Sequence, residues 1–140
     1  MDHSYGIQFV SGKFDFESKL PEEYNAGNRC YGRDVAVFIA TSLTAQGMKS
    51  DFLGEDWGWL VFSLKGTKPE FDVAVYNMAD ENGSATSKWG LWVRSYERSK
   101  LLGLIPKRTE VVVPPSLITA LKTAVLSAGA KPLPWPDAPH

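Results

Sequence analysis

Histidine is missing from the body of the sequence, and cysteine is almost absent. The only histidines are His3 and His140, at the two ends, and the only cysteine is Cys30. Because imidazole is the side chain that most often transfers protons near neutral pH, histidine-dependent catalysis and histidine metal sites are nearly excluded. A lone cysteine forms no disulfide within the chain and no zinc site, so we expect neither a metal nor another cofactor.

Long apolar runs and the common catalytic motifs are also missing. No stretch approaches the roughly 20 apolar residues that cross a bilayer, and Met1–Gly6 lacks the features of a signal peptide. Together with the single cysteine, this predicts a cytoplasmic protein without a membrane partner. The glycine spacings of phosphate-binding and dinucleotide-binding loops are absent, as is a Gly-x-Ser-x-Gly elbow.

What the sequence does have is the composition of one ordinary domain. Its 140 residues are 44% hydrophobic and 22% charged, which predicts one domain over residues 1–130 and a proline-rich tail over 131–140. The net charge of −1 is too small to indicate nucleic acid. Residues 51–85 have a net charge of −5 and residues 86–140 a net charge of +5. Such a dipole can steer a charged partner at either pole, or the halves neutralise one another after folding.

Two segments have the spacing of amphipathic helices. In Gly32–Gln46 the apolar residues recur at helical intervals, with Asp34 near the start and Gly47 just after the end. A second helix begins at Pro114-Pro115, where proline fits the first turn, and ends at Gly129.

Alternating apolar residues indicate strands in the rest of the chain. Residues 6–17 predict one bent strand, Phe52–Leu64 a central strand that is apolar on both faces, and Phe71–Tyr76 and Trp89–Tyr96 half-buried strands. Residues 97–113 are ambiguous between a short helix, a buried loop and a brief strand. The order β-α-β-β-β-(short β)-α predicts an α+β fold, with two helices packed on one face of an antiparallel sheet of four to five strands.

The most distinctive motif places two carboxylates before two tryptophans. Within the predicted strand, Trp57 and Trp59 share a face, and Glu55 and Asp56 lie at its entrance. Such a site can accept a cationic or guanidinium-bearing partner, although we favour the simpler interpretation of solvated acids followed by core tryptophans. Neighbouring carboxylates on a strand point to opposite faces, so they are no glycosidase pair.

A second candidate surface lies on the last of these strands. Trp92, Arg94 and Tyr96 alternate and therefore share a face, and Tyr76 has the same role on the neighbouring strand. If the helices cover the other face, these side chains are exposed, and their residue types are those enriched at binding hot spots. The alternative is that residues 97–113 or the tail cover these rings.

Cys30 lies between two arginines near the start of the first helix. Such surroundings favour a thiolate, which can act as a nucleophile. The domain offers no histidine to serve as its base, so we favour a non-catalytic cysteine.

These segments resemble a pattern shared by small uncharacterised bacterial proteins, over about two-thirds of the chain. The pattern is a loop with proline and asparagine, a helix, an acidic Asp-Trp-Gly-Trp strand and a strand with tryptophan and valine. Its counterparts here are Leu20-Pro21, Asn28, Gly32–Gln46, Glu55–Trp59 and Trp92-Val93 within Trp89–Arg94. The family implies no activity. The layout is also similar to that of immunity proteins that neutralise secreted bacterial toxins, which implies a protein partner.

Taken together, these features predict a non-catalytic protein-binding domain, immunity-like, that neutralises a bacterial toxin by direct binding. The expected partner is a protein such as a cognate toxin; the oligomeric state is left open. The predicted contact residues are Glu55, Asp56, Trp92, Arg94 and Tyr96. The alternative is a small-molecule-binding domain with an aromatic-lined pocket between sheet and helices, built from Trp57, Trp59, Tyr76 and Trp92. An enzyme ranks third and a nucleic-acid-binding domain fourth.

Overall fold

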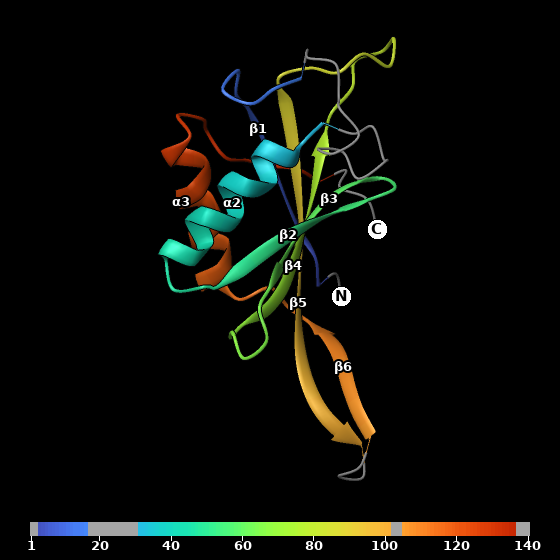
Figure 1. Cartoon of the computed structure of the whole chain (residues 1–140), viewed down its shortest axis with the longest axis vertical. Coiled ribbons are helices and arrows are strands. Elements are labelled where there is room, and N and C mark those ends of the chain that lie inside the picture. The colour runs from blue at the N-terminus through green and yellow to red at the C-terminus, as the bar shows by residue number, and fades with distance from the viewer. Residues whose placement is uncertain (1–2, 17–30, 102–104, 137–140) are drawn as a thin grey trace.

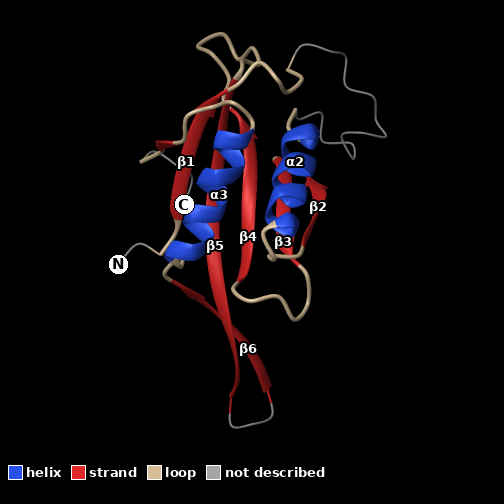
Figure 2. Cartoon of the chain, turned by 90° about the vertical axis from the view of Figure 1, so that its left-hand side faces the viewer, coloured by secondary structure: helices blue, strands red, loops and turns tan. Residues whose placement is uncertain are grey.

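The chain folds as an antiparallel sheet with two helices against one of its faces. The structure, a computed structural model, describes residues 3–16, 31–101 and 105–136. Figures 1 and 2 show both helices on the same side of the sheet, which confirms the predicted α+β fold. No helix in these ranges is long and apolar enough to span a membrane. In chain order the elements are β1 (Tyr5–Val10), α2 (Arg33–Ala45), β2 (Ser50–Glu55), β3 (Gly58–Ser63), β4 (Glu70–Asn77), β5 (Lys88–Leu101), β6 (Ile105–Val111), α3 (Pro115–Ser127) and β7 (Leu133–Pro134).

Strand β5 organises the sheet. The strand order is β2-β3-β4-β5-β1-β7, and β6 also pairs with β5. The first part of β5 pairs with β1 as far as Val93, and β6 takes over on the same strand from Ser95. Strand β4 stops pairing with β5 at Tyr96, so residues 97–101 of β5 and residues 105–109 of β6 form a two-stranded ribbon, named the ribbon below, which projects from the body (Figure 1).

The core lies between the helices and the covered face of the sheet. Both helices begin and end close to the predicted positions, with positive φ angles of 130° at Gly32 and 89° at Gly47. Both glycines flank α2. These angles strain any residue with a Cβ atom, so glycine is suited to the start and to the end of this helix. The largest fully buried side chains are Trp89, Phe9, Phe71, Ile7, Ile39, Leu43, Leu91, Leu117, Leu121, Val35, Val61 and Val73.

The predicted single strand over Phe52–Leu64 is in fact a hairpin. Strand β2 ends at Glu55, Asp56 and Trp57 form the turn, and β3 begins at Gly58. A two-residue loop is enough to join antiparallel strands, and this one lacks the Asn-Gly or Asp-Gly pair that usually marks such a loop. The two-residue spacing of Trp57 and Trp59 continues the alternation of a strand, so the sequence does not mark the turn.

The sheet has seven strands over the described residues rather than four to five. Two of the added strands arise in segments without a core-facing pattern. The ambiguous residues 97–113 continue β5 and form β6, which no helix of the described chain covers in Figure 2. The tail contributes β7, because Leu133 pairs with Gln8 and Pro134 with Ile7 on β1.

Gly58 is a position where the sheet leaves no room for a side chain. A Cβ atom there would lie 2.8 Å from the carbonyl oxygen of Val75, a backbone atom that cannot rotate away. We expect Gly58→Ala to lower the free energy of unfolding by about 1–3 kcal/mol, measured by urea denaturation. Gly12→Ala is the control, because a Cβ atom at Gly12 meets no atom within 4 Å. Equal losses in the two variants would contradict the argument.

Candidate functional site

The sheet face that the helices leave open carries the side chains predicted from the last meander strand. Trp92, Arg94 and Tyr96 are half-buried and alternate with the fully buried Leu91 and Val93 of the core face. Because successive side chains on a strand point to opposite faces, these three residues point away from the helices. This surface is named the open face below.

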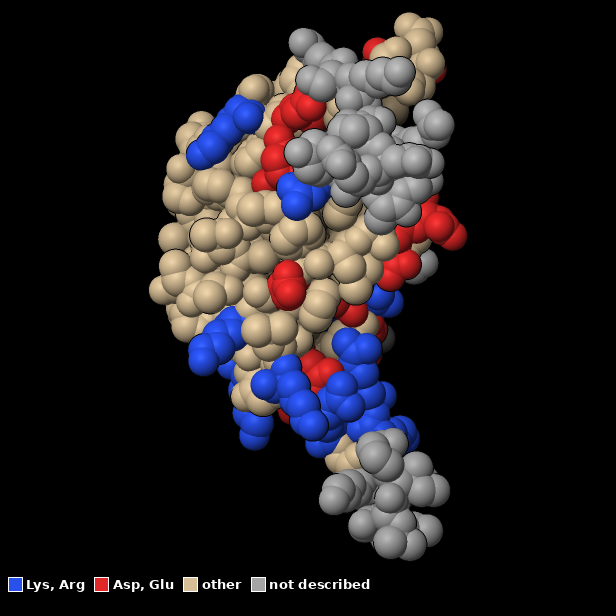
Figure 3. All heavy atoms as spheres, viewed as in Figure 1, with Lys and Arg blue, Asp and Glu red and all other residues tan. Residues whose placement is uncertain are grey.

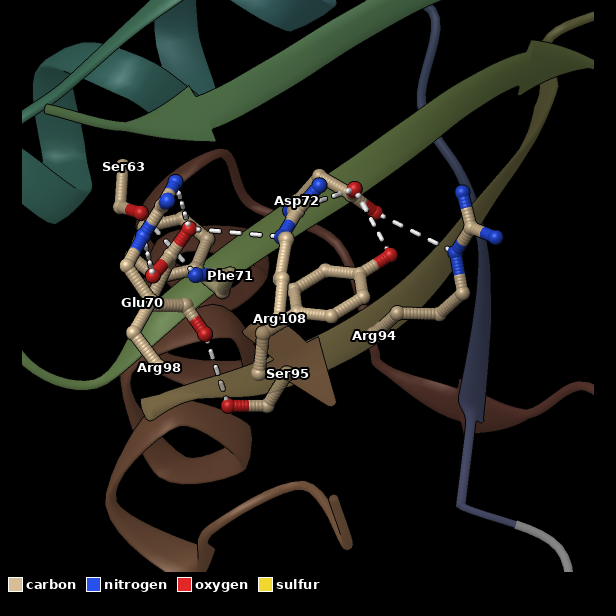
Figure 4. A network of polar contacts seen from close by, with 9 residues as sticks. Ser63, Glu70, Phe71, Asp72, Arg94, Ser95, Arg98 and Arg108 are labelled. Carbon is tan, nitrogen blue, oxygen red and sulfur yellow. Dashed lines mark hydrogen bonds and ion pairs between the residues drawn. The ribbon is translucent and has the colours of Figure 1, made fainter. Parts of the chain in front are cut away.

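Asp72 is the centre of a polar cluster on the open face (Figure 4). Its side chain accepts a hydrogen bond from Arg94 Nε at 3.3 Å and another from Tyr96 Oη at 3.1 Å. Arg108 Nη2 lies 3.5 Å from the same carboxylate. Asp72 is only 6% exposed, and a carboxylate that is this buried is stable only when several donors surround it.

Glu70 connects the body of the protein to the ribbon. Its carboxylate accepts hydrogen bonds from Arg98 Nε at 2.8 Å and Arg98 Nη2 at 2.9 Å. Arg108 Nε lies 3.3 Å from Glu70 Oε1. The hydrogen bonds to Glu70 raise the pKa of Arg98. Arg98 and Arg108 are direct partners across the two strands of the ribbon, and their positive charges repel each other. The Glu70 carboxylate contacts both guanidinium groups and so offsets this repulsion.

Arginine side chains in the cluster also lie over aromatic rings. The guanidinium carbon of Arg94 is 5.0 Å from the centre of the Trp92 ring, and that of Arg108 is 3.4 Å from the Tyr96 ring. Burial, and then the nearby Asp72 carboxylate, raise the pKa of Tyr96 to about 12, so its phenol stays neutral and donates. We name this group the polar cluster: Glu70, Asp72, Arg94, Tyr96, Arg98 and Arg108.

The other end of the open face carries a row of aromatic rings. The Trp57 and Tyr76 rings lie 5.2 Å apart, and Trp135 meets Tyr76 edge-on at 5.9 Å. A Cβ atom at Gly90 would lie 2.6 Å from the Trp135 ring, so the glycine permits this contact. We name Trp57, Tyr76 and Trp135 the aromatic row. Trp135 covers part of the open face, as the alternative interpretation of the tail anticipated.

A shallow hollow of about 260 Å³ lies beside the aromatic row and is lined in part by Tyr31, Trp57 and Tyr76. A second hollow of about 270 Å³ lies between α2 and β2 and is lined in part by Thr41, Thr44 and Asp51. Both are small beside the roughly 300–1,000 Å³ of sites that bury a drug-sized ligand.

The structure corrects the prediction that Trp57 and Trp59 share a face. Trp57 lies in the turn and is 44% exposed, whereas Trp59 is 4% exposed on the core face, where Gly32 lies close to its ring. The hairpin separates the two tryptophans, because the turn breaks the alternation of a single strand. Of the predicted pocket residues Trp57, Trp59, Tyr76 and Trp92, Trp57 and Tyr76 line the hollow beside the aromatic row, whereas Trp59 lies on the other face of the sheet.

The predicted contact residues fall into two groups on the open face. Glu55 and Asp56 are exposed beside Trp57 of the aromatic row, and Glu55 pairs with Gly58. Trp92, Arg94 and Tyr96 lie at or beside the polar cluster, several residues further along the sheet. Cys30 lies outside the described residues.

Sequence reasoning missed four of the six residues of the polar cluster, although a signal for part of it exists. Glu70 and Asp72 alternate on β4, as Arg94, Tyr96 and Arg98 do on β5. The strand register places Glu70 opposite Tyr96 and Asp72 opposite Arg94. Complementary charges at matching intervals on two predicted neighbouring strands could have indicated the cluster. Arg108 could not be found in this way, because the ribbon was not predicted.

The fold and this surface define an α+β protein with one open, aromatic- and arginine-bearing sheet face. Among the residues that the structure describes, no three His, Cys, Asp or Glu side chains gather to hold a metal ion. Comparison with protein-family models, with curated proteins and with solved structures found no match for the chain.

Replacing Glu70 tests how the ribbon is held. In Glu70→Gln the facing Arg98 and Arg108 lose the charge that lies between them, so the ribbon should open more often. We expect its amide hydrogens to exchange with solvent about five- to tenfold faster, measured by mass spectrometry. Glu97→Gln removes the same charge at an exposed position of β5 and is the control. Unchanged exchange in Glu70→Gln would show that the ion pairs do not stabilise the ribbon.

Proposed function

We propose that this protein is a non-catalytic protein-binding domain that contacts another protein through its open face. The observation that carries the proposal is that large contact-type side chains on this face are held in place before any partner arrives. Arg94 is fixed by Asp72 and Trp92, and Trp57 packs on Tyr76. Side chains that are already ordered lose little conformational entropy on binding, so more of the contact energy becomes affinity.

The chemistry of the open face also favours binding over catalysis. Its most buried carboxylate, Asp72, is committed to two arginines and a tyrosine, and Glu70 is committed to two arginines. These contacts give both carboxylates a structural role, because they hold the arginine and tyrosine side chains of the face in place. Tryptophan, tyrosine and arginine are the residue types that dominate the energetics of protein interfaces.

In its specific form, the proposal is an immunity-like cytoplasmic protein that neutralises a bacterial toxin by covering the toxin's site. The two charged ends of the open face support this form, because complementary charges select one partner and speed association. Figure 3 shows Lys and Arg side chains gathered where the ribbon leaves the body, with acidic side chains among and above them.

Side-chain footprinting with hydroxyl radicals tests which face binds. The tagged protein is used to capture a stoichiometric partner from its native host, and the purified complex is oxidised. We expect oxidation of Trp57 and Trp92 to fall in the complex, whereas Leu126 of α3, which is 60% exposed, reacts as before. Trp92→Ala should lose the partner. Protection of Leu126 with unchanged tryptophans, or the failure to capture any partner, would refute the proposal.

The acidic pair beside Trp57 should act on the rate of association. We expect Glu55→Lys/Asp56→Lys to slow association about three- to tenfold at low salt and to change the dissociation rate less, measured by surface plasmon resonance with the captured partner. Glu81→Lys/Glu97→Lys changes the net charge equally at other exposed positions and is the matched control. An unchanged association rate at low salt would exclude these acids from the contact surface.

A further inference from the structure

The polar cluster has one more cationic than anionic group. Three guanidinium groups, those of Arg94, Arg98 and Arg108, face the two carboxylates of Glu70 and Asp72. Glu110 lies beside the cluster, directly opposite Tyr96 on β6, and within the cluster itself the arginines outnumber the carboxylates by one, so an anion from a partner can be accommodated there.

Arg94 is the member with donors to spare. Arg98 uses Nε and Nη2 on Glu70, and Arg108 uses Nε on Glu70 and Nη2 on Asp72. Arg94 uses only Nε, on Asp72, and its two Nη atoms make no hydrogen bond within the described part of the chain. Figure 4 shows these Nη atoms pointing away from Asp72. The side chain is 36% exposed, so the pair of donors is accessible.

The orientation of Arg94 is set by two different contacts. The hydrogen bond to Asp72 fixes one edge of the guanidinium plane, and the Trp92 ring lies 5.0 Å from its centre. The free edge then presents two parallel N–H donors, which is the geometry that receives both oxygens of a carboxylate or phosphate group.

Resting on the proposed function, we infer that the polar cluster binds a carboxylate of a short acidic segment of the partner protein, with the Nη pair of Arg94 as its anchor. The charge on the rest of the open face favours such a segment over nucleic acid. Glu55 and Asp56 lie at the β2–β3 turn, at the other end of this face, and are exposed. They would repel a long polyanion that ran across the sheet, whereas a few carboxylates at the cluster alone avoid them.

The inference predicts how the partner is oriented. Its acidic segment would lie at the polar cluster, and a basic group would lie near Glu55 and Asp56 at the opposite end of the face. A single pair of complementary charges leaves the register of an interface open, while two pairs of opposite sign determine its direction.

The test uses a fluorescein-labelled hexaglutamate peptide and the full chain in low salt, with binding followed by fluorescence anisotropy. We expect saturable binding that weakens about five- to tenfold in Arg94→Gln and in Arg94→Lys. Arg94→Lys keeps a positive charge beside Asp72, so the net charge of the cluster is unchanged while the paired donors are lost. Lys122→Gln, on the helical side of the molecule, removes one positive charge as Arg94→Gln does and should bind the peptide as the unaltered protein does.

Three outcomes would overturn the inference. In the first, Lys122→Gln weakens peptide binding as much as the Arg94 variants, which would make the attraction non-specific. In the second, oligothymidylate of the same charge binds more tightly than the peptide and depends on Arg94, which would assign the cluster to nucleic acid. In the third, capture of the native partner is lost in Trp92→Ala but unchanged in Arg94→Lys. That last result would remove the anion anchor and leave the proposed function standing.

Discussion

The backbone ladder of strand β5 is the interaction on which the rest of the structure depends. This strand is 14 residues long, against about 5–6 for an average strand, and it pairs with β4, β1 and β6. At the point where β1 gives way to β6, the buried Ser95 hydroxyl donates to the backbone oxygen of Glu70 at 2.9 Å. The polar cluster lies at this same place. The pairing of this one strand therefore determines both the sheet and the position of the polar cluster, so a change in its register would displace both.

The open face combines segments that are far apart in the chain. Asp72 comes from β4, its partners come from β5 and β6, and Trp135 comes from the tail after α3. Each contribution satisfies a separate physical need: donors for a buried carboxylate, a counter-charge between facing arginines, and a ring to fill the space above a glycine. A surface assembled in this way is fixed by folding itself, so a partner meets it already formed.

Features that follow from the local spacing of apolar residues could be predicted from the sequence. Features that depend on pairing between distant segments could not. Both helices were found because their apolar stripes and their terminal glycines are local signals, and the face of Trp92, Arg94 and Tyr96 follows from alternation alone. The β2–β3 turn was missed because Asp56-Trp57 is not a usual turn pair, and the two-residue spacing of Trp57 and Trp59 is that of a continuous strand. The ribbon was missed because its residues 97–99 and 107–109 are exposed and polar, so no apolar alternation marks these two strands. The place of Trp135 over Gly90 depends on the complete fold, and no local pattern encodes it.

Because its facing arginines depend on Glu70, the ribbon responds to dissolved ions differently from the body. Burial of apolar side chains beneath the helices is strengthened by many salts, whereas ion pairs at exposed positions are weakened as the screening length shrinks to about 10 Å in 0.1 M salt. The chain therefore consists of two parts with opposite responses to ionic strength. The sheet and its helices give a rigid platform, and the ribbon is an arm whose stiffness is set by the surrounding electrolyte.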